Sequence, residues 1–486
     1  MQFARIAAVL AAPAILGACA VFLGLDDHEL YPPADAAIDV DSAPVDVSAC
    51  GDTQTDPANC GACGHACGAG YECIAGACGN DVVGVAAGSH GCVLLRGGEV
   101  WCWGPNTTGQ LGVRAEACTA CPKPAKVAGV ANAVELSSSA NGSCIRDKAG
   151  AVICWGIDNA GQLGRAGDAT CAYGGPCSMK PAAVPIPPAV QVSVGEGYAC
   201  ARLADGSLRC WGDNSQGELG VGAPTDGAHP VPVTVAITSD VVDVAAGHGY
   251  ASTCATKKDG SLWCWGQNVR GILGHTGGGD TTCPISAPSS PCNATPSPVA
   301  NFSSFTAALV SRVTCGKSTS SDFYCWGYNG NGQIGLGIVD AVDHAVPALV
   351  TALKATTISP GYNHTCALDA DGAAWCWGYN FWGEVGDGTI RSTTACEGGP
   401  LYCVPHAARV LNVPKLTAIS AGADVTLGLG VDGTVWAWGA NPDGRTGHAP
   451  GKSDAGPSDD NCSLVVGDAS TGGPCTAHPM RVIGLP

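Results

Sequence analysis

The stretch WGPNTTGQLG, residues 103–112, decides how this chain folds, because six variants of it follow. They read WGIDNAGQLG, WGDNSQGELG, WGQNVRGILG, WGYNGNGQIG, WGYNFWGEVG and WGANPDGRTG, each beginning 51 to 61 residues after the previous one. The copies begin at Trp103, Trp155, Trp211, Trp265, Trp326, Trp377 and Trp438. A recurring period of this size indicates a repeat architecture in which each copy is one small structural unit.

Each copy has the surroundings of a small antiparallel sheet. An apolar or alternating run such as VVDVAAG (241–247) precedes it, then a turn centred on glycine, and a Pro-x-x-Val-like segment follows it. Such runs predict short β-strands. One small sheet of this size cannot bury both faces alone, whereas sheets packed around an axis bury them against their neighbours. We therefore expect an all-β propeller, with the seven tryptophans in the core between blades.

The seven copies resemble the regulator of chromosome condensation repeat family, and the resemblance covers residues 80–486. It implies a seven-bladed β-propeller with four antiparallel strands in each blade. The strand that begins at Val82 has no Pro-x-x-Val segment before it, and the chain ends in the unpaired segment PMRVIGLP (479–486). We therefore predict that the C-terminal strand completes the first blade and closes the ring.

Six copies carry two cysteines ten residues apart. The pairs are Cys92 and Cys102, Cys144 and Cys154, Cys200 and Cys210, Cys254 and Cys264, Cys315 and Cys325, and Cys366 and Cys376. The seventh copy has Leu427 and Ala437 there, so both partners are lost together, as expected if they bond to each other. A residue six positions after the first cysteine is glycine in every copy except the fifth, which has Ser321. A three-residue hairpin loop ending there in the left-handed conformation would place the cysteines opposite each other, about 4.5 Å apart at Cα.

Ten more cysteines lie in the connections that follow the tryptophan motifs. They pair as Cys118 with Cys121, Cys171 with Cys177, Cys283 with Cys292, Cys396 with Cys403, and Cys462 with Cys475. We expect disulfides that restrain these loops on one face of the ring. The spacing of Cys118 and Cys121 also leaves a redox-active pair open.

The N-terminus predicts export. Residues 1–18 contain one early arginine and an apolar run from Ile6 to Leu16, which is typical of a signal peptide and short for a membrane span. The run ends in Leu16-Gly17-Ala18-Cys19, which resembles a bacterial lipobox and implies lipid attachment at Cys19. An ordinary cleaved signal with a chance cysteine is the alternative. Removing Cys19 from the 29 cysteines leaves an even number, which favours the lipoprotein.

Two short regions separate this start from the propeller. Residues 19–49 form an acidic tether, since 26–49 hold seven acidic residues and no lysine or arginine. Residues 50–79 form a small module containing Cys50, Cys60, Cys63, Cys67, Cys73 and Cys78. With so little apolar surface, the module needs disulfides to hold it, and zinc at the Cys60-x-x-Cys63 pair is the alternative.

Composition limits the function. Twenty-nine cysteines suit an oxidising compartment, and a net charge of −18 disfavours nucleic acid. The sequence holds no Ser-His-Asp order, phosphate-binding loop or HExxH motif, so we assign no catalytic residue, cofactor or metal. His90 and His364 each lie two residues before a paired cysteine, where a packing role is preferred to a metal site.

Phe381 and Trp382 interrupt the repeat pattern at a turn and form a candidate binding pair, with packing onto the nearby disulfide loop as the alternative. The leading hypothesis is a monomeric propeller at the bacterial outer membrane or cell surface, held by its lipid. Its loops would bind a protein, peptide or glycan. Family resemblance also raises guanine-nucleotide exchange, which export and acidity disfavour. A third possibility is an enzyme that uses the central channel.

Overall fold

The computed structural model divides the chain into two units, residues 1–47 and 48–486. It describes residues 71–74, 77–80, 82–113, 118–171, 175–275, 280–283, 290–299, 304–351, 353–390, 392, 394–397, 399, 402–450, 460–461 and 474–485, all in the second unit. The predicted signal peptide, Cys19, the acidic tether, Cys50, Cys60, Cys63, Cys67 and Cys462 lie outside these residues. No helix among the described residues is long and apolar enough to cross a membrane.

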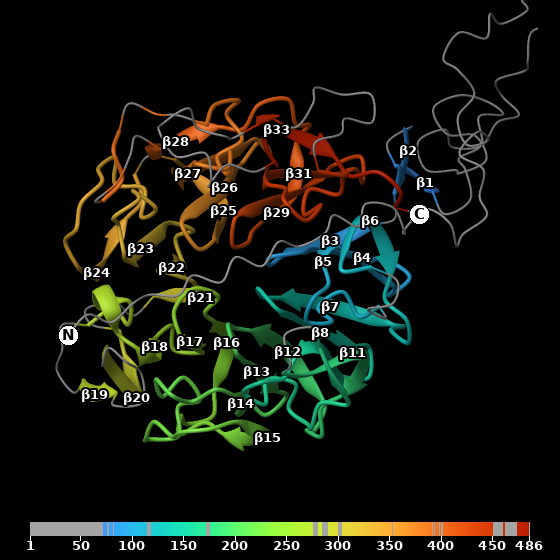
Figure 1. The fold of residues 1–486 in the computed structure, drawn as a ribbon. Coiled ribbons are helices and arrows are strands. Elements are labelled where there is room, and N and C mark those ends of the chain that lie inside the picture. Colours follow the sequence, from blue (N-terminus) through green and yellow to red (C-terminus); the bar gives the residue numbers. More distant parts are fainter. Residues whose placement is uncertain are drawn as a thin grey trace, which may run out of the picture. The chain divides into compact units, whose positions relative to one another are not determined.

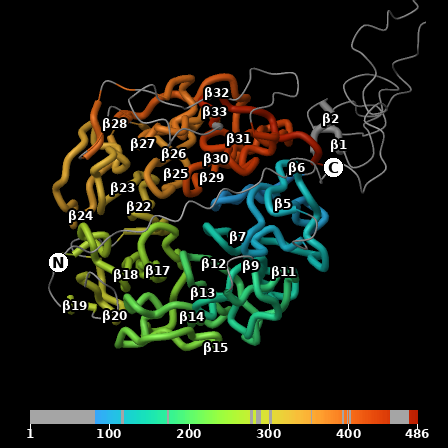
Figure 2. Tube along the Cα trace, viewed as in Figure 1, coloured from blue at the N-terminus to red at the C-terminus, as the bar shows by residue number. Residues whose placement is uncertain are grey.

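Seven antiparallel sheets follow one another along the second unit, as Figure 1 shows. Their first strands are β3 (Val82–Ala87), β7 (Ala133–Ser138), β12 (Ala189–Val194), β16 (Val241–Ala246), β21 (Phe305–Val310), β25 (Ala355–Pro360) and β29 (Leu416–Ala421). Their second strands are β4 (Gly91–Leu95), β8 (Gly142–Asp147), β13 (Tyr198–Leu203), β17 (Ser252–Lys257), β22 (Val313–Ser318), β26 (His364–Asp369) and β30 (Val425–Gly430). Each first strand contacts the first strands of the blades on both sides, so these strands surround the axis (Figure 2).

The third and fourth strands extend each blade outward. The third strands are β5 (Val100–Pro105), β9 (Val152–Ile157), β14 (Leu208–Gly212), β18 (Leu262–Gln267), β23 (Phe323–Gly327), β27 (Ala374–Tyr379) and β31 (Val435–Ala440). The fourth strands are β6 (Ala120–Lys126), β11 (Pro176–Ala183), β15 (His229–Thr234), β20 (Ser290–Pro298), β24 (His344–Leu349), β28 (Cys403–Arg409) and β33 (Pro474–Arg481). The predicted seven-bladed, all-β propeller is confirmed.

The seven motif tryptophans join each blade to the one before it. All are at most 1% exposed. Each indole Nε1–H donates to a backbone carbonyl in the motif of the preceding blade, at 2.8–3.0 Å. The pairs are Trp103 with Arg445, Trp155 with Gln110, Trp211 with Gln162, Trp265 with Glu218, Trp326 with Ile272, Trp377 with Gln333 and Trp438 with Glu384. The Trp103 bond spans 342 residues and joins the first blade to the last.

The prediction that the C-terminal strand completes the first blade is wrong. β33 pairs with β31 and is the fourth strand of the seventh blade, while the first blade takes its fourth strand, β6, from its own repeat. The ring therefore closes by packing between complete blades. The end of the chain still contributes, because Val482 and Leu485 lie in the core shared by the first and seventh blades.

The predicted cysteine hairpins are present in six blades. In each, the two cysteines are direct cross-strand partners joined by a disulfide, with Cα atoms 4.1 Å apart. Leu427 lies opposite Ala437 in the same register in the seventh blade. The loop residue has positive φ in all seven hairpins, between 76° and 85° for the glycines and 64° for Ser321. One local geometry therefore serves all seven copies.

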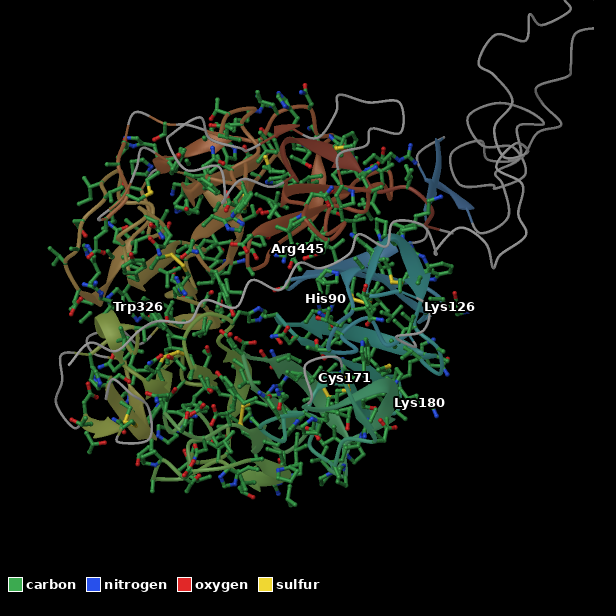
Figure 3. The ribbon with its side chains drawn as sticks, viewed as in Figure 1. His90, Lys126, Cys171, Lys180, Trp326 and Arg445 are labelled. Carbon is green, nitrogen blue, oxygen red and sulfur yellow. A yellow bond between two sulfur atoms is a disulfide. The ribbon has the colours of Figure 1, made fainter. Side chains whose placement is uncertain are left out.

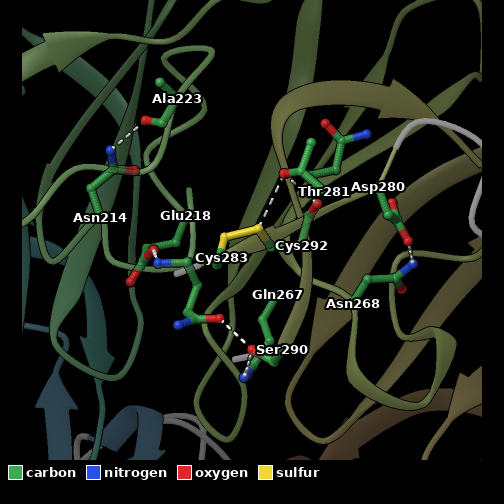
Figure 4. The surroundings of a disulfide bond; sticks show 12 residues. Asn214, Glu218, Ala223, Gln267, Asn268, Asp280, Thr281, Cys283, Ser290 and Cys292 are labelled. Carbon is green, nitrogen blue, oxygen red and sulfur yellow. Dashed lines mark hydrogen bonds between the residues drawn. A yellow bond between two sulfur atoms is a disulfide. The ribbon is translucent and has the colours of Figure 1, made fainter. Parts of the chain in front are cut away.

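The bridged loops add strands that the sequence did not predict. β10 (Ala169–Thr170), β19 (Thr281–Cys283) and β32 (Asp460–Asn461) each pair with the fourth strand of a blade, so three sheets have five strands. Disulfides join Cys118 to Cys121, Cys171 to Cys177, Cys283 to Cys292 and Cys396 to Cys403. Figure 4 shows the Cys283–Cys292 bond tying β19 to β20. Cys475 is also in a disulfide.

Two smaller elements complete the described structure. β1 (Tyr71–Ile74) and β2 (Ala77–Asn80) form a hairpin in which Cys73 lies opposite Cys78. A single 3-10 turn, η2 (Val269–Gly271), replaces the usual turn in the fourth blade.

Ser321 offers a test of the hairpin geometry. A residue with a Cβ is strained at positive φ, and glycine is not, so Ser321→Gly should raise the free energy of unfolding by about 1 kcal/mol. Ser321→Ala keeps the strain and should bring no such gain. Denaturant unfolding of the three proteins measures the difference, and equal stabilities would contradict the argument.

Candidate binding face

Two kinds of connection leave the propeller on the same side. Because neighbouring strands run antiparallel, the turns from first to second strand and the connections from third to fourth strand emerge together. We call this side the turn face. Its inner part consists of residues 88–90, 139–141, 195–197, 247–251, 311–312, 361–363 and 422–424. Its outer part carries the tryptophan motifs and the bridged loops.

Polar and aromatic side chains from four blades meet at the centre of the turn face. We call Glu196, Tyr250, Arg312, Tyr362 and Asn363 the central cluster. The Tyr362 hydroxyl donates to Glu196, which joins the sixth blade to the third. The Arg312 guanidinium lies 5.4 Å from the Tyr362 ring and 5.7 Å from the Tyr250 ring. It also donates to Oδ1 of Asn363 at 2.9 Å. The cluster therefore links the third, fourth, fifth and sixth blades.

Ion pairs continue outward from this cluster. Arg445 lies 3.5 Å from Asp424 and 3.3 Å from Asp443 in the seventh blade. Figure 3 labels Arg445 beside His90 of the first blade, at the seam where the ring closes.

A second arginine ties three outer connections together. Arg270 of the fourth blade lies 3.4 Å from Asp343 and 3.2 Å from Glu397, which belong to the fifth and sixth blades. Its guanidinium lies 5.5 Å from the Tyr328 ring. These contacts fix the relative positions of loops that the sequence places 70 to 130 residues apart.

The charges of the central region balance one another. The Glu196 side chain keeps contact with solvent, but partial desolvation by the surrounding protein raises the pKa of its carboxyl, while the Tyr362 hydroxyl and the Arg312 charge oppose this shift. Burial likewise raises the pKa of Asp424, against the charges of Arg445 and Arg312. Desolvation and the neighbouring Glu196 carboxylate raise the pKa of Tyr362, so this phenol stays protonated and can donate. Such an arrangement is suited to polar recognition.

The candidate pair Phe381 and Trp382 lies in the outer part of the turn face, and both side chains are half-buried. The Phe381 ring centroid is 4.6 Å from that of Trp382 and 5.0 Å from that of Tyr402. Phe381 also packs on the core around Cys396, Tyr402 and Cys403. Phe381 therefore packs onto the disulfide loop, as the alternative interpretation expected. Binding of a partner by the pair stays a prediction.

His90 and His364 pack between blades. Both are fully buried, and Nε2 of each lies within hydrogen-bond distance of a hydroxyl in the next blade. His90 is 2.9 Å from Ser143 Oγ, and His364 is 2.8 Å from Thr426 Oγ1. Burial lowers the pKa of each imidazole to about 4. Within the described ranges, no three His, Cys, Asp or Glu side chains are grouped so that they could hold a metal ion.

Two sequence models of the regulator of chromosome condensation (RCC1) repeat match the chain. One matches residues 82–110, 189–218, 241–272, 355–383 and 416–445, and the other matches 97–145, 205–253, 259–321 and 322–368. Together they cover more than half of the 486 residues. The chain belongs to the RCC1 repeat family.

RCC1-repeat relatives are similar along most of their length. The chain is 29% identical over 376 residues to the ultraviolet-B receptor UVR8 of Arabidopsis thaliana, covering 74% of this chain and 77% of the relative. It is 26% identical over 380 residues to the mouse regulator of chromosome condensation, covering 72% and 82%. The fold is also that of yeast RCC1 (Prp20), solved bound to Kap60, with a TM-score of 0.63 at 20% identity over 82% of this chain and 85% of that one.

Sequence reasoning missed the central cluster. Its residues occupy one aligned turn of the RCC1 repeats, between the first strand and the paired cysteine, where the copies read GEGY, GHGYAS, SRV and GYNH. The signal was available, because these turns differ in length and in residues between copies, while the strands before them keep the same length. The contacts among them were not available, since they depend on how the ring brings separate turns together.

At one aligned position of the RCC1 repeats, two copies have a buried glutamate where three others have a glutamine. Gln110, Gln162, Glu218, Gln333 and Glu384 each accept a hydrogen bond from the backbone N–H two residues earlier. Figure 4 shows Glu218, which is fully buried and whose Oε1 has no hydrogen-bond partner among the described residues. Burial, with a smaller contribution from the Asp213 charge, raises the pKa of Glu218 to about 8.

Glu218→Gln should therefore stabilise the protein in a pH-dependent way. Below pH 4.5 the carboxyl is protonated in both states and costs little. Between pH 4.5 and pH 8 the carboxyl loses its proton in the unfolded chain but keeps it in the folded one. The free energy of unfolding therefore falls by about 1.4 kcal/mol per pH unit, and a glutamine at this position avoids the loss. Denaturant unfolding at pH 4 and pH 8 should show a gain of a few kcal/mol at pH 8 alone.

Glu99→Gln is the matched control, because the hydrogen bond from Lys126 lowers the pKa of this exposed carboxylate. It should bring no gain at pH 8. A Glu218→Gln gain of equal size at both pH values would contradict the titration argument.

Proposed function

We propose that this chain is an exported binding propeller that recognises a protein partner through its turn face. The observation that carries the proposal is the central cluster, which gathers one arginine and two tyrosines at the middle of that face. Arginine and tyrosine are enriched at protein interfaces and dominate their binding energy. The half-buried pair Phe381 and Trp382 adds aromatic surface on the same side.

The support for a protein partner comes from rigidity and from relatives. Disulfides and ion pairs hold the outer connections before any partner arrives, and such preorganisation reduces the entropy lost on binding. Yeast RCC1, with the same fold, has been solved bound to Kap60. We therefore favour a protein or peptide over a glycan as the ligand.

Recognition by the turn face can be tested by capturing proteins on the immobilised chain and on variants of it. Immobilised protein should retain a defined set of proteins from an envelope extract, and Arg312→Ala should reduce the retained set at least tenfold, because this guanidinium contacts two rings of the cluster. Replacing Phe381 and Trp382 together by alanine tests the outer patch. Quantitative mass spectrometry of the eluates gives the comparison.

Lys258→Ala is the matched control. Lys258 lies in the hairpin between β17 and β18, on the side opposite the turn face, and pairs with Asp240 at an exposed site. This variant should retain the same proteins as the unmodified chain. Retention that is unchanged in Arg312→Ala, or lost equally in Lys258→Ala, would contradict recognition by the turn face.

We further propose export to a bacterial outer membrane or cell surface by a lipid on Cys19. Ten disulfides among the described residues support an oxidising compartment, because reducing cytosol would open them. The lipobox-like Leu16-Gly17-Ala18-Cys19 supplies the anchor.

Metabolic labelling tests the anchor. Cells that express the chain should incorporate radioactive palmitate into it, and Cys19→Ser should abolish the label and release the protein from the membrane fraction. Cys462→Ser is a control that keeps the leader intact. Equal labelling of the Cys19→Ser variant would place the lipid elsewhere, and an unlabelled, soluble wild-type protein would indicate ordinary secretion.

A further inference from the structure

A pocket of about 160 Å³ opens on the turn face between the second and third blades. Its walls include Ser139, Asn141 and Gly142 from the second blade and Gly195 and Glu196 from the third. Trp155 forms part of the lining. Glu196 belongs to the central cluster and is exposed, so the pocket adjoins the proposed binding surface.

The repeats explain why space remains here. Gly142 lies opposite Gly156, and the residue in this register position differs among the blades. From the first blade to the seventh it is His90, Gly142, Tyr198, Ser252, Val313, His364 and Val425. Glycine is the smallest of the seven. A Cβ at position 142 would approach only the Trp155 carbonyl, at 3.3 Å, so the backbone has room for a side chain with a small adjustment.

Rings fill the corresponding space in three other blades. His90 reaches from the first blade to Ser143 of the second, and His364 reaches from the sixth blade to Thr426 of the seventh. Tyr198 reaches from the third blade into the fourth. The pocket beside Gly142 is therefore a site where the fold accepts one planar ring and the described part of this chain supplies none.

The polar atoms around the pocket distinguish a phenol from an imidazole. Both histidines use a hydroxyl on the next blade, but Ala199 occupies the corresponding position beyond Gly142. Tyr198 also meets a hydroxyl on the next blade, since it accepts from Thr253 Oγ1 at 3.1 Å. Unlike the histidines it has two main-chain partners besides, because its hydroxyl donates to the Ser252 carbonyl at 2.6 Å and accepts from the Gly247 N–H at 2.8 Å. The third blade has an equivalent pair of main-chain atoms. Its Gly195 N–H donates to the Tyr198 carbonyl, just as the Gly247 N–H of the fourth blade donates to the Ser252 carbonyl.

We propose that the pocket binds the phenol ring of a tyrosine side chain presented by the protein partner. The proposal rests on the turn-face recognition argued above and names the chemistry at one of its subsites. The ring would stand where a side chain at position 142 would stand, with its hydroxyl at the Gly195 N–H and the Tyr198 carbonyl. A concave site between two blades can bury most of the surface of such a ring, which favours binding.

Binding of p-cresol, the free tyrosine side chain, tests the pocket directly. Ligand-observed NMR on the full chain should give a Kd on the order of 1 mM, as expected for so small a ligand. Gly142→Tyr fills the pocket from within and should weaken p-cresol binding at least tenfold. His90→Gly, which opens the corresponding space between the first and second blades, should create an additional site. 4-Methylimidazole should bind several-fold more weakly than p-cresol to the unmodified chain.

The outcomes separate clearly. Equal p-cresol affinity in the Gly142→Tyr variant, or no binding to the unmodified chain, would overturn the proposal, and tighter binding of 4-methylimidazole would overturn the assignment to tyrosine. If Gly142→Tyr does not fold, crystals of the unmodified protein soaked in 4-bromophenol decide the matter. A bromine peak between Gly142 and Gly195 supports the site, and peaks elsewhere alone contradict it. If capture were lost in Arg312→Ala but unaffected by Gly142→Tyr, the pocket would take no part in recognition, and recognition by the turn face would still stand.

Discussion

One hydrogen bond, repeated seven times, sets the architecture of this protein. Each motif tryptophan is buried between two blades, and its indole N–H donates to a carbonyl of the preceding motif. A buried donor without a partner costs about 1–3 kcal/mol, so every blade needs its neighbour. For seven blades in a chain, the first tryptophan finds its acceptor only if the last blade returns to it. Trp103 and Arg445 make that contact, and it closes the ring without an exchanged strand.

Because of this constraint, different parts of the structure have different roles. Tryptophans and apolar side chains hold blades together, while the six hairpin disulfides act within blades and the remaining described disulfides act in the outer connections. The turns on the inner part of the turn face contain no motif tryptophan and no disulfide, although His90 and the central cluster add polar contacts between blades there. They are therefore able to vary from copy to copy, and the central cluster around Arg312 arises where four of them meet.

Sequence reasoning reached the fold because the fold is local and repeated. The period located the blades, and the cysteine spacing fixed the hairpin register that places Cys92 opposite Cys102. Closure was predicted wrongly, since the choice of β33 between the first and seventh blades depends on long-range packing that PMRVIGLP does not encode by itself. The central cluster and the Gly142 pocket escaped for a related reason. Their residues are separate in sequence, and only the curvature of the ring brings Tyr362 to Glu196 or leaves Gly142 without a ring.

Hydrogen exchange of the indole N–H groups tests the closed ring most directly. In protein labelled with ¹⁵N-tryptophan, the seven motif indoles should exchange only through global unfolding, with nearly equal free energies of opening. Trp103 should be as protected as the other six, since its bond to Arg445 is one of seven equivalent contacts. If the Trp103 indole exchanged orders of magnitude faster than the rest, the seam between the first and seventh blades would be open in solution, and closure by the tryptophan contacts would be contradicted.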